Sequence, residues 1–132
     1  MDRKRVRAFH RRLETEVAGA QFNCLLTRDA KLHRWNREFL QADYPTDVLS
    51  FPEPGPGFLG ELAISVDRAA AQAAEFGHSL EDEIEILMLH GALHLTGMDH
   101  EQDKGQMARA EAKWRKRLGL PTGLIQRARK RS

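Results

Sequence analysis

The sequence predicts a domain that contains both helices and short strands. Several segments carry apolar residues every three or four positions, which is the spacing of one face of a helix. Between them stand shorter runs of strand-forming residues that end at proline or glycine. The chain has 132 residues, enough for one hydrophobic core and too few for two substantial ones. We therefore expect residues 1–132 to form a single domain.

The N-terminal third is predicted to contain two helices separated by a strand. Apolar residues at helical spacing indicate a helix over residues 6–17, and Gly19 ends it. Residues 22–27 fit a short strand. A second helix fits residues 30–40, with Asp29 as its N-cap.

The middle of the chain is predicted to contain a turn and two further strands. Residues 44–47 read Tyr-Pro-Thr-Asp, a turn in which the Thr and Asp side chains are expected to satisfy backbone amides. The strand over residues 48–51 is expected to stop at Pro52, before a loop rich in proline and glycine. Residues 59–66 give the next strand.

The C-terminal half is predicted to be helical. Asp67 is expected to cap a helix that runs to Phe76. Ser79 with Asp82 three residues later resembles a capping box and predicts the start of the next helix, which carries two histidines. A last helix is expected over residues 101–118.

The charges are strongly segregated, although the net charge is only +2. Residues 1–12 hold six basic side chains against one acid, and residues 113–132 hold eight with no acid. We expect residues 121–132 to form a basic tail. Basic ends suit a polyanion, because lysine and arginine bind phosphates without sequence preference. Solvated tails and helix faces are an equally good explanation.

The sequence predicts a cytoplasmic protein without a membrane partner. The N-terminus is charged, and histidines and a glutamate interrupt the most apolar stretch, so neither a signal peptide nor a membrane span is indicated. Cys24 is the single cysteine, which agrees with a reducing compartment and with a small buried residue.

Three histidines lie within eleven residues and have the spacing of a metal site. His90 and His94 stand four apart, so a helix places both rings on one face. Gly97 can end the helix and let the chain bring His100 toward them. Catalytic zinc usually keeps three protein ligands and one open position, whereas structural zinc is closed by four, often with cysteine. The sequence therefore predicts an open Zn²⁺ site. Glu83 shares the histidine face but lies about 10 Å from His90 along the axis, too far to be a ligand.

These residues carry a resemblance to a known family. The run from His90 to His100 reads HGALHLTGMDH and is similar to the H-G-x-L-H-L-x-G-x-D-H signature of the YbeY family. Residues 36–39, 45–52 and 59–65 also resemble blocks of that family. Its members are ribosomal-RNA maturation factors described as single-strand-specific zinc endoribonucleases.

The resemblance implies a fold, a cofactor and a substrate. The fold would be α+β, a small mixed sheet covered by helices with the zinc site at the end of a central helix. One zinc ion would be held by His90, His94 and His100. The substrate would be single-stranded ribosomal RNA, in 16S rRNA 3′-end maturation and ribosome quality control, with the small ribosomal subunit as partner and no DNA. The family has an arginine where this chain has Leu40, and Arg37 one turn earlier is the candidate phosphate contact.

The general base is not fixed by the pattern. Zinc proteases with H-E-x-x-H use the glutamate after the first histidine, and this chain has Gly91 there. Water on the zinc is the expected main catalyst, with Asp99, Glu61 and Glu101 as candidate bases. Asp99 is expected rather to orient a ligand histidine or to cap the turn.

Three functions remain open from the sequence. The leading prediction is a zinc-dependent endoribonuclease. The alternative is a zinc-containing ribosome-assembly or RNA-binding factor with little catalysis, motivated by Leu40 and by Gly91. A zinc peptidase is the least favoured, again because of Gly91.

Overall fold

The computed structural model describes residues 1–40, 46–100 and 102–131. In chain order the elements are α1 (Arg3–Arg12), the π-helical turn η1 (Leu13–Ala18), β1 (Gln21–Thr27), α2 (Asp29–Leu40), β2 (Val48–Gly55), β3 (Phe58–Ser65), α3 (Val66–Phe76), α4 (Leu80–Leu95), α5 (Gln106–Leu118) and α6 (Leu124–Arg131).

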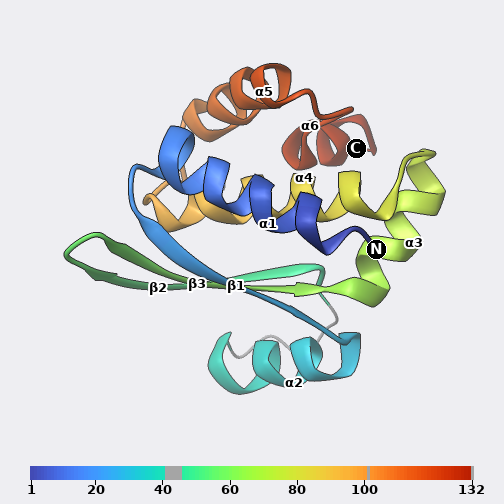
Figure 1. Ribbon diagram of the computed structural model, residues 1–132, viewed down its shortest axis with the longest axis horizontal. Helices are drawn as coiled ribbons and strands as arrows, with labels where there is room; N and C mark the ends of the chain where they lie inside the picture. Colours follow the sequence, from blue (N-terminus) through green and yellow to red (C-terminus); the bar gives the residue numbers. More distant parts are fainter. Residues whose placement is uncertain (41–45, 101, 132) are drawn as a thin grey trace.

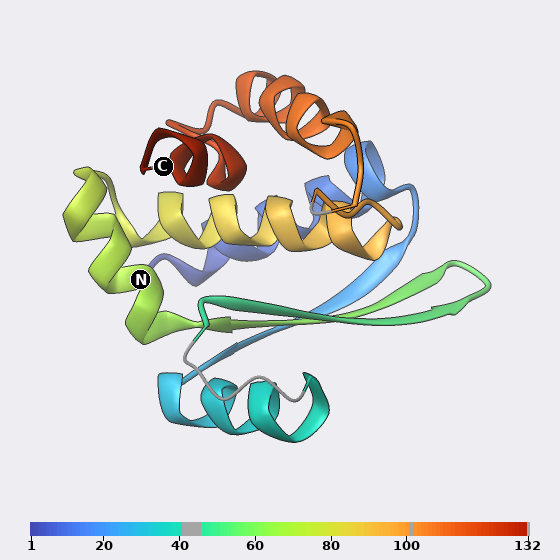
Figure 2. The same cartoon turned by 180° about the vertical axis from the view of Figure 1, so that it is seen from behind.

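The described elements are arranged in layers around a small sheet. Figures 1 and 2 show α2 on one face of the sheet and α1 and α4 on the other. The helices α5 and α6 lie on the far side of α4, which is therefore covered from both directions. This arrangement confirms the predicted α+β fold with helices that cover a sheet.

The sheet has three strands in the order β1-β3-β2 and is mixed, as predicted. The central strand β3 pairs in parallel with β1 and antiparallel with β2. Successive side chains of a strand point to opposite faces. Leu62 and Ile64 accordingly join the main core with α4, while Ala63 packs with Leu32 of α2.

The central helix α4 is almost entirely buried, from Glu83 to Leu93 without a break. Its N-terminus is the predicted capping box, in which Ser79 Oγ accepts from the Asp82 amide at 3.0 Å. The helix ends at Leu95, and Gly97 turns the chain with φ of 102°. These signals fix where the two histidines of the helix stand.

The prediction that β2 stops at Pro52 was wrong. The strand runs on to Gly55, and Pro52 pairs in register with Gly60 of β3. β2 lies at the edge of the sheet, where a residue without an amide hydrogen can be placed without the loss of a ladder hydrogen bond.

The cap of α3 also differs from the prediction. Ser65 Oγ accepts from the Arg68 amide at 3.1 Å and caps the helix. Asp67, the predicted cap, accepts instead from the Asp29 amide at 2.8 Å and ties α3 to the start of α2. This amide, rather than an arginine, is the main reason that the pKa of Asp67 lies below its usual value.

The C-terminal segment predicted as a basic tail contains a helix. Residues 124–131 form α6, and Arg127 is buried. The preceding helix α5 begins at Gln106, later than expected, because residues 102–105 form a turn in which Asp103 accepts from two backbone amides.

Among the described residues, no helix is long and apolar enough to cross a membrane.

Candidate metal centre

The three predicted histidines lie together at the C-terminal end of α4. His90 and His94 come from the last two turns of the helix, and His100 comes from the loop that follows Gly97. One nitrogen from each ring lies within 4.8 Å of the others. The ring centroids are 4.8 to 5.5 Å apart. This cluster could hold a metal ion.

The hydrogen bonds of the rings leave one nitrogen of each helical histidine available. His90 Nδ1 lies 2.8 Å from Glu111 Oε2, and His94 Nδ1 lies 2.9 Å from the Met98 carbonyl oxygen. A carbonyl and a carboxylate only accept hydrogen bonds, so each Nδ1 carries the proton. In the neutral imidazole Nε2 is then the nitrogen that can bind a metal, which is the arrangement that metal-bound imidazoles have in proteins.

The electrostatic surroundings of His94 also favour the binding of a metal cation. Burial lowers the pKa of His94, and the neighbouring His90 and His100 lower it further. The neutral imidazole, which is the form that binds a metal, is therefore favoured at neutral pH. Three imidazoles without a thiolate suit zinc and several other borderline ions, so the donor set fits the predicted cofactor.

Glu111 of α5 holds the His90 ring of the metal centre in place. Its side chain is buried, and its second oxygen, Oε1, accepts from the Ile125 amide at 2.8 Å. A Cβ at Gly123 would lie 2.5 Å from the same oxygen, so this position has to be glycine for Glu111 to approach. One carboxylate thus orients His90 and holds the start of α6.

The histidines open into a cleft of about 720 Å³. On one side lie His90, His94 and the loop over residues 97–100. On the other side lies the edge strand β2, with Asn36 of α2 beside it. The cleft is lined by Asn36, Thr46, Asp47, Val48, Leu49, Ser50, Pro52, His90, His94, Gly97, Met98, Asp99, His100 and Leu124.

The three other predicted catalytic residues are placed differently from one another. Asp99 lines the cleft and is exposed, next to His100. Arg37 is exposed on α2, beside Asn36. Glu61 is exposed on β3 and alternates with Leu62, so it lies with Ala63 on the face of the sheet opposite α4. The sheet therefore lies between Glu61 and the histidines.

Parts of the sequence prediction lie outside the part that the structure describes, including residues 44–45 of the predicted turn. Glu101, a candidate base, and the side chain of Leu40 also lie outside it.

Gly91 follows the first histidine because of packing. A Cβ at this position would lie 2.7 Å from Leu62 Cδ2, so α4 approaches the sheet closely here. A glutamate at position 91 would point into the core rather than toward the cleft. The geometry therefore excludes the glutamate base of a zinc peptidase at this position.

Sequence reasoning missed two polar residues at the centre. Glu111 lies one turn after Met107 on the buried face of α5, and a carboxylate on an apolar face is the signal that could have revealed it. Asp47, expected to cap its own turn, also accepts from Gln72 Nε2 at 3.2 Å and lines the cleft. No local pattern links position 47 to position 72.

Comparisons with known proteins agree with this architecture. Residues 3–119 match the family model described as endoribonuclease YbeY. An endoribonuclease YbeY of Solibacter usitatus is 63% identical over 126 residues, which cover 95% of this chain and 85% of the relative. One from Koribacter versatilis is 49% identical over 110 residues, which cover 83% and 72%.

A solved structure is also similar. The solution structure of TM1509 from Thermotoga maritima superposes with a TM-score of 0.60 and 28% identity, over 86% of this chain and 80% of that one. The family resemblance predicted from the sequence is thereby confirmed: the chain belongs to the endoribonuclease YbeY family.

Proposed function

We propose that the chain, folded as one domain, is a zinc-dependent endoribonuclease that cleaves single-stranded ribosomal RNA. Membership of an endoribonuclease family supports the cleavage of RNA. The observation that carries the zinc dependence is the cluster of His90, His94 and His100 at an open cleft. Three protein ligands leave a position for water or substrate.

The chain's own residues would position the reacting groups. Zinc, when bound, supplies a Lewis acid for a phosphoryl oxygen and lowers the pKa of a bound water to about 7. Glu111 fixes the ring of His90, and the Met98 carbonyl fixes that of His94. Asp99 lies at the cleft, where its carboxylate can accept a proton. Arg37 is proposed to hold a phosphate beyond the cleft.

The shape of the site favours a single strand. His90 is only 6% exposed and His94 is half-buried, so the scissile phosphate has to enter the cleft to reach them. A single strand can bend its backbone and splay its bases, whereas a duplex presents a stiff and wide surface. The edge strand β2 would lie along the backbone of the bound RNA.

Basic residues on the surface provide a general attraction for RNA. Arg5 and Arg127 form ion pairs with acidic side chains of α4. Others, including Arg7, Arg11 and Lys116, are exposed. Exposed cations of this kind bind phosphates irrespective of sequence.

We assign the protein to 16S rRNA 3′-end maturation and ribosome quality control on the small subunit in the cytoplasm, as the family resemblance implies.

The test is the cleavage of a labelled single-stranded RNA by extensively purified protein of measured zinc content. Wild-type protein is compared with His94→Ala, whose fold is checked by circular dichroism. Both are assayed as purified, after chelation and after zinc is restored. We expect wild-type cleavage to disappear with the metal and to return with zinc, and His94→Ala to remain inactive throughout.

Two results would contradict the proposal. Equal cleavage by wild type and variant would identify a contaminating nuclease. RNA binding without cleavage by the zinc-loaded wild type would favour the alternative, an assembly factor that binds RNA without cutting it.

A further inference from the structure

A second pocket, which we call the side pocket, opens from the metal centre away from β2. It has a volume of about 440 Å³ and shares His90, His100, Asp47 and Leu124 with the histidine cleft. Beyond them it extends between α3 and α6. Its remaining lining residues are Gln72, Phe76, Ile125 and Arg127. A group bound here would be continuous with one bound at the histidines.

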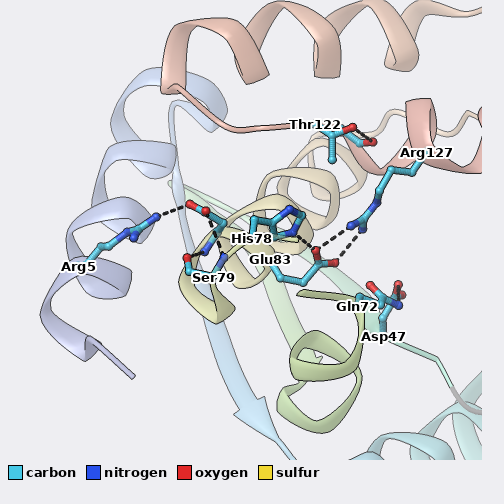
Figure 3. A network of polar contacts seen from close by, with 10 residues as sticks. Arg5, Asp47, Gln72, His78, Ser79, Glu83, Thr122 and Arg127 are labelled. Atoms are coloured by element: carbon cyan, nitrogen blue, oxygen red, sulfur yellow. Dashed lines mark hydrogen bonds and ion pairs between the residues drawn. The ribbon is translucent and has the colours of Figure 1, made fainter. Parts of the chain in front are cut away.

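The charges of the side pocket do not suit a phosphate. Arg127 is buried, and both of its terminal nitrogens donate to Glu83, at 2.7 and 2.8 Å (Figure 3). The guanidinium also lies 4.4 Å from the centre of the Phe76 ring. Its positive charge is thus neutralised by Glu83, and Asp47 adds a carboxylate to the lining. A neutral ligand is favoured over an anion.

The surfaces of the side pocket suit a flat heterocycle. Phe76, Leu124 and Ile125 provide apolar contact, and pockets of this size with apolar walls and a few polar groups are typical ligand sites. RNA bases that leave the stack are usually held against such side chains. The pocket is therefore suited to a nucleobase.

The polar groups at one end of the side pocket are hydrogen-bond acceptors. Gln72 Nε2 donates to Asp47 Oδ2 at 3.2 Å, and the two side chains lie next to each other in Figure 3. This bond fixes the orientation of the amide and leaves Gln72 Oε1 as an acceptor. Oε1 is buried and has no hydrogen-bond partner among the described residues. Buried acceptors are normally paired, so this oxygen is available to a hydrogen-bond donor of a ligand.

We propose that the side pocket receives one base of the RNA, next to the bond that is cut, and selects bases that carry an amino group. Cytosine and adenine offer an exocyclic amine to Gln72 and Asp47, whereas uracil offers a carbonyl oxygen at the position of the cytosine amine. The inference rests on the proposed function, because it takes RNA as the substrate. It adds a preference that the histidine cleft alone does not provide.

The test measures binding rather than cleavage. Fluorescein-labelled 2′-O-methyl hexamers of cytidine and of uridine are titrated with zinc-loaded protein and followed by anisotropy, and their length is checked afterwards. We expect wild type to bind the cytidine hexamer about fivefold more tightly, the effect of roughly one hydrogen bond.

Two variants and one control locate the effect. Gln72→Leu removes the unpaired acceptor at similar size and leaves only Asp47 as an acceptor, so it is expected to reduce the preference. Asp47→Asn keeps an acceptor for Gln72 Nε2 and turns the other oxygen into an N–H donor, so it should favour uridine. Gln126→Leu, the same change at an exposed position of α6, should behave as wild type. Circular dichroism verifies that each variant is folded.

The outcomes separate this inference from the proposed function. Equal wild-type affinity for both hexamers, or a preference that survives unchanged in folded Gln72→Leu and Asp47→Asn, overturns the side pocket as a base site while RNA cleavage stands. Failure of wild type to bind either hexamer, together with absent cleavage, overturns both.

Discussion

Glu83 of α4 and Arg127 of α6 form a buried, bidentate ion pair, with N–O distances of 2.7 and 2.8 Å. His78 Nε2 lies 2.7 Å from the same carboxylate, at Oε1 (Figure 3). Glu83 is fully buried and Arg127 is 5% exposed. Charges removed from water in this way are retained only when each has its partner. The pair therefore holds α6 against the central helix, where α6 forms one wall of the side pocket.

Loss of one partner is expected to be costly. Arg127→Met keeps much of the side-chain volume but leaves Glu83 buried with only His78 beside it, which should lower the free energy of unfolding by about 3–5 kcal/mol. The double variant Arg127→Met/Glu83→Gln should be the more stable of the two, because the orphaned charge is gone. Urea denaturation measures both, with Gln126→Met as the control on α6. An equal decrease in the free energy of unfolding of the single and double variants would show that the pair acts by packing alone.

A side chain at position 91 is expected to destabilise the fold. Gly91→Ala places a methyl group 2.7 Å from Leu62 Cδ2, so the buried Leu62 side chain, α4 or the sheet has to shift, at a cost of about 1–3 kcal/mol. Leu62→Ala removes the obstructing group but leaves a cavity. The two substitutions together should be less destabilising than the sum of the single ones. Thermal unfolding of the four proteins tests this, and simple additivity would mean that the close contact is not the reason for glycine.

Local patterns predicted most of the elements and the histidine cluster. The spacing of His90 and His94, the stop at Gly97 and the capping box at Ser79 act within a few residues of each other, so the sequence displays them directly. The mixed sheet and its covering helices followed from the family resemblance. The prediction was less successful where a side chain has alternative partners, as with Asp67, which bonds to the start of α2 instead of capping α3.

The remaining parts depend on contacts between distant segments. In the sequence Arg127 is one of several basic residues near the C-terminus. Only the fold shows that it pairs with Glu83, 44 positions earlier. Glu61 was a plausible base by residue type, but the alternation of β3 directs it away from the histidines. Glu111 and Asp47 were missed as site residues because only the tertiary fold brings them to the centre. Side-chain roles of this kind are fixed by packing rather than by local sequence.

Glu111 is expected to control the affinity for the metal. Glu111→Gln retains an oxygen that can accept from the Ile125 amide, so α6 should stay in place. The loss of the carboxylate beside His90 Nδ1 makes that imidazole less basic, and such changes typically weaken metal binding about 10–100-fold. Competition for zinc with a chromophoric chelator measures the difference. Glu53→Gln, at an exposed position of β2, is the matched control, and equal zinc affinity in the two variants would argue against the positioning role.

Cys24 is expected to be unreactive in the folded protein. Burial raises the pKa of its thiol to about 12, whereas an unfolded thiol titrates near about 8.5. The reactive thiolate is thus nearly absent at pH 8, and alkylation of this partly buried residue should be much slower than in the unfolded chain. The same difference predicts a loss of stability as the pH rises from about 9 toward 12, because only the unfolded chain readily releases the proton. Urea denaturation at pH 8 and pH 10 should show a smaller decrease for Cys24→Ala than for wild type. Rapid labelling of the native protein at pH 8, at a rate independent of urea, would contradict the burial of the thiol.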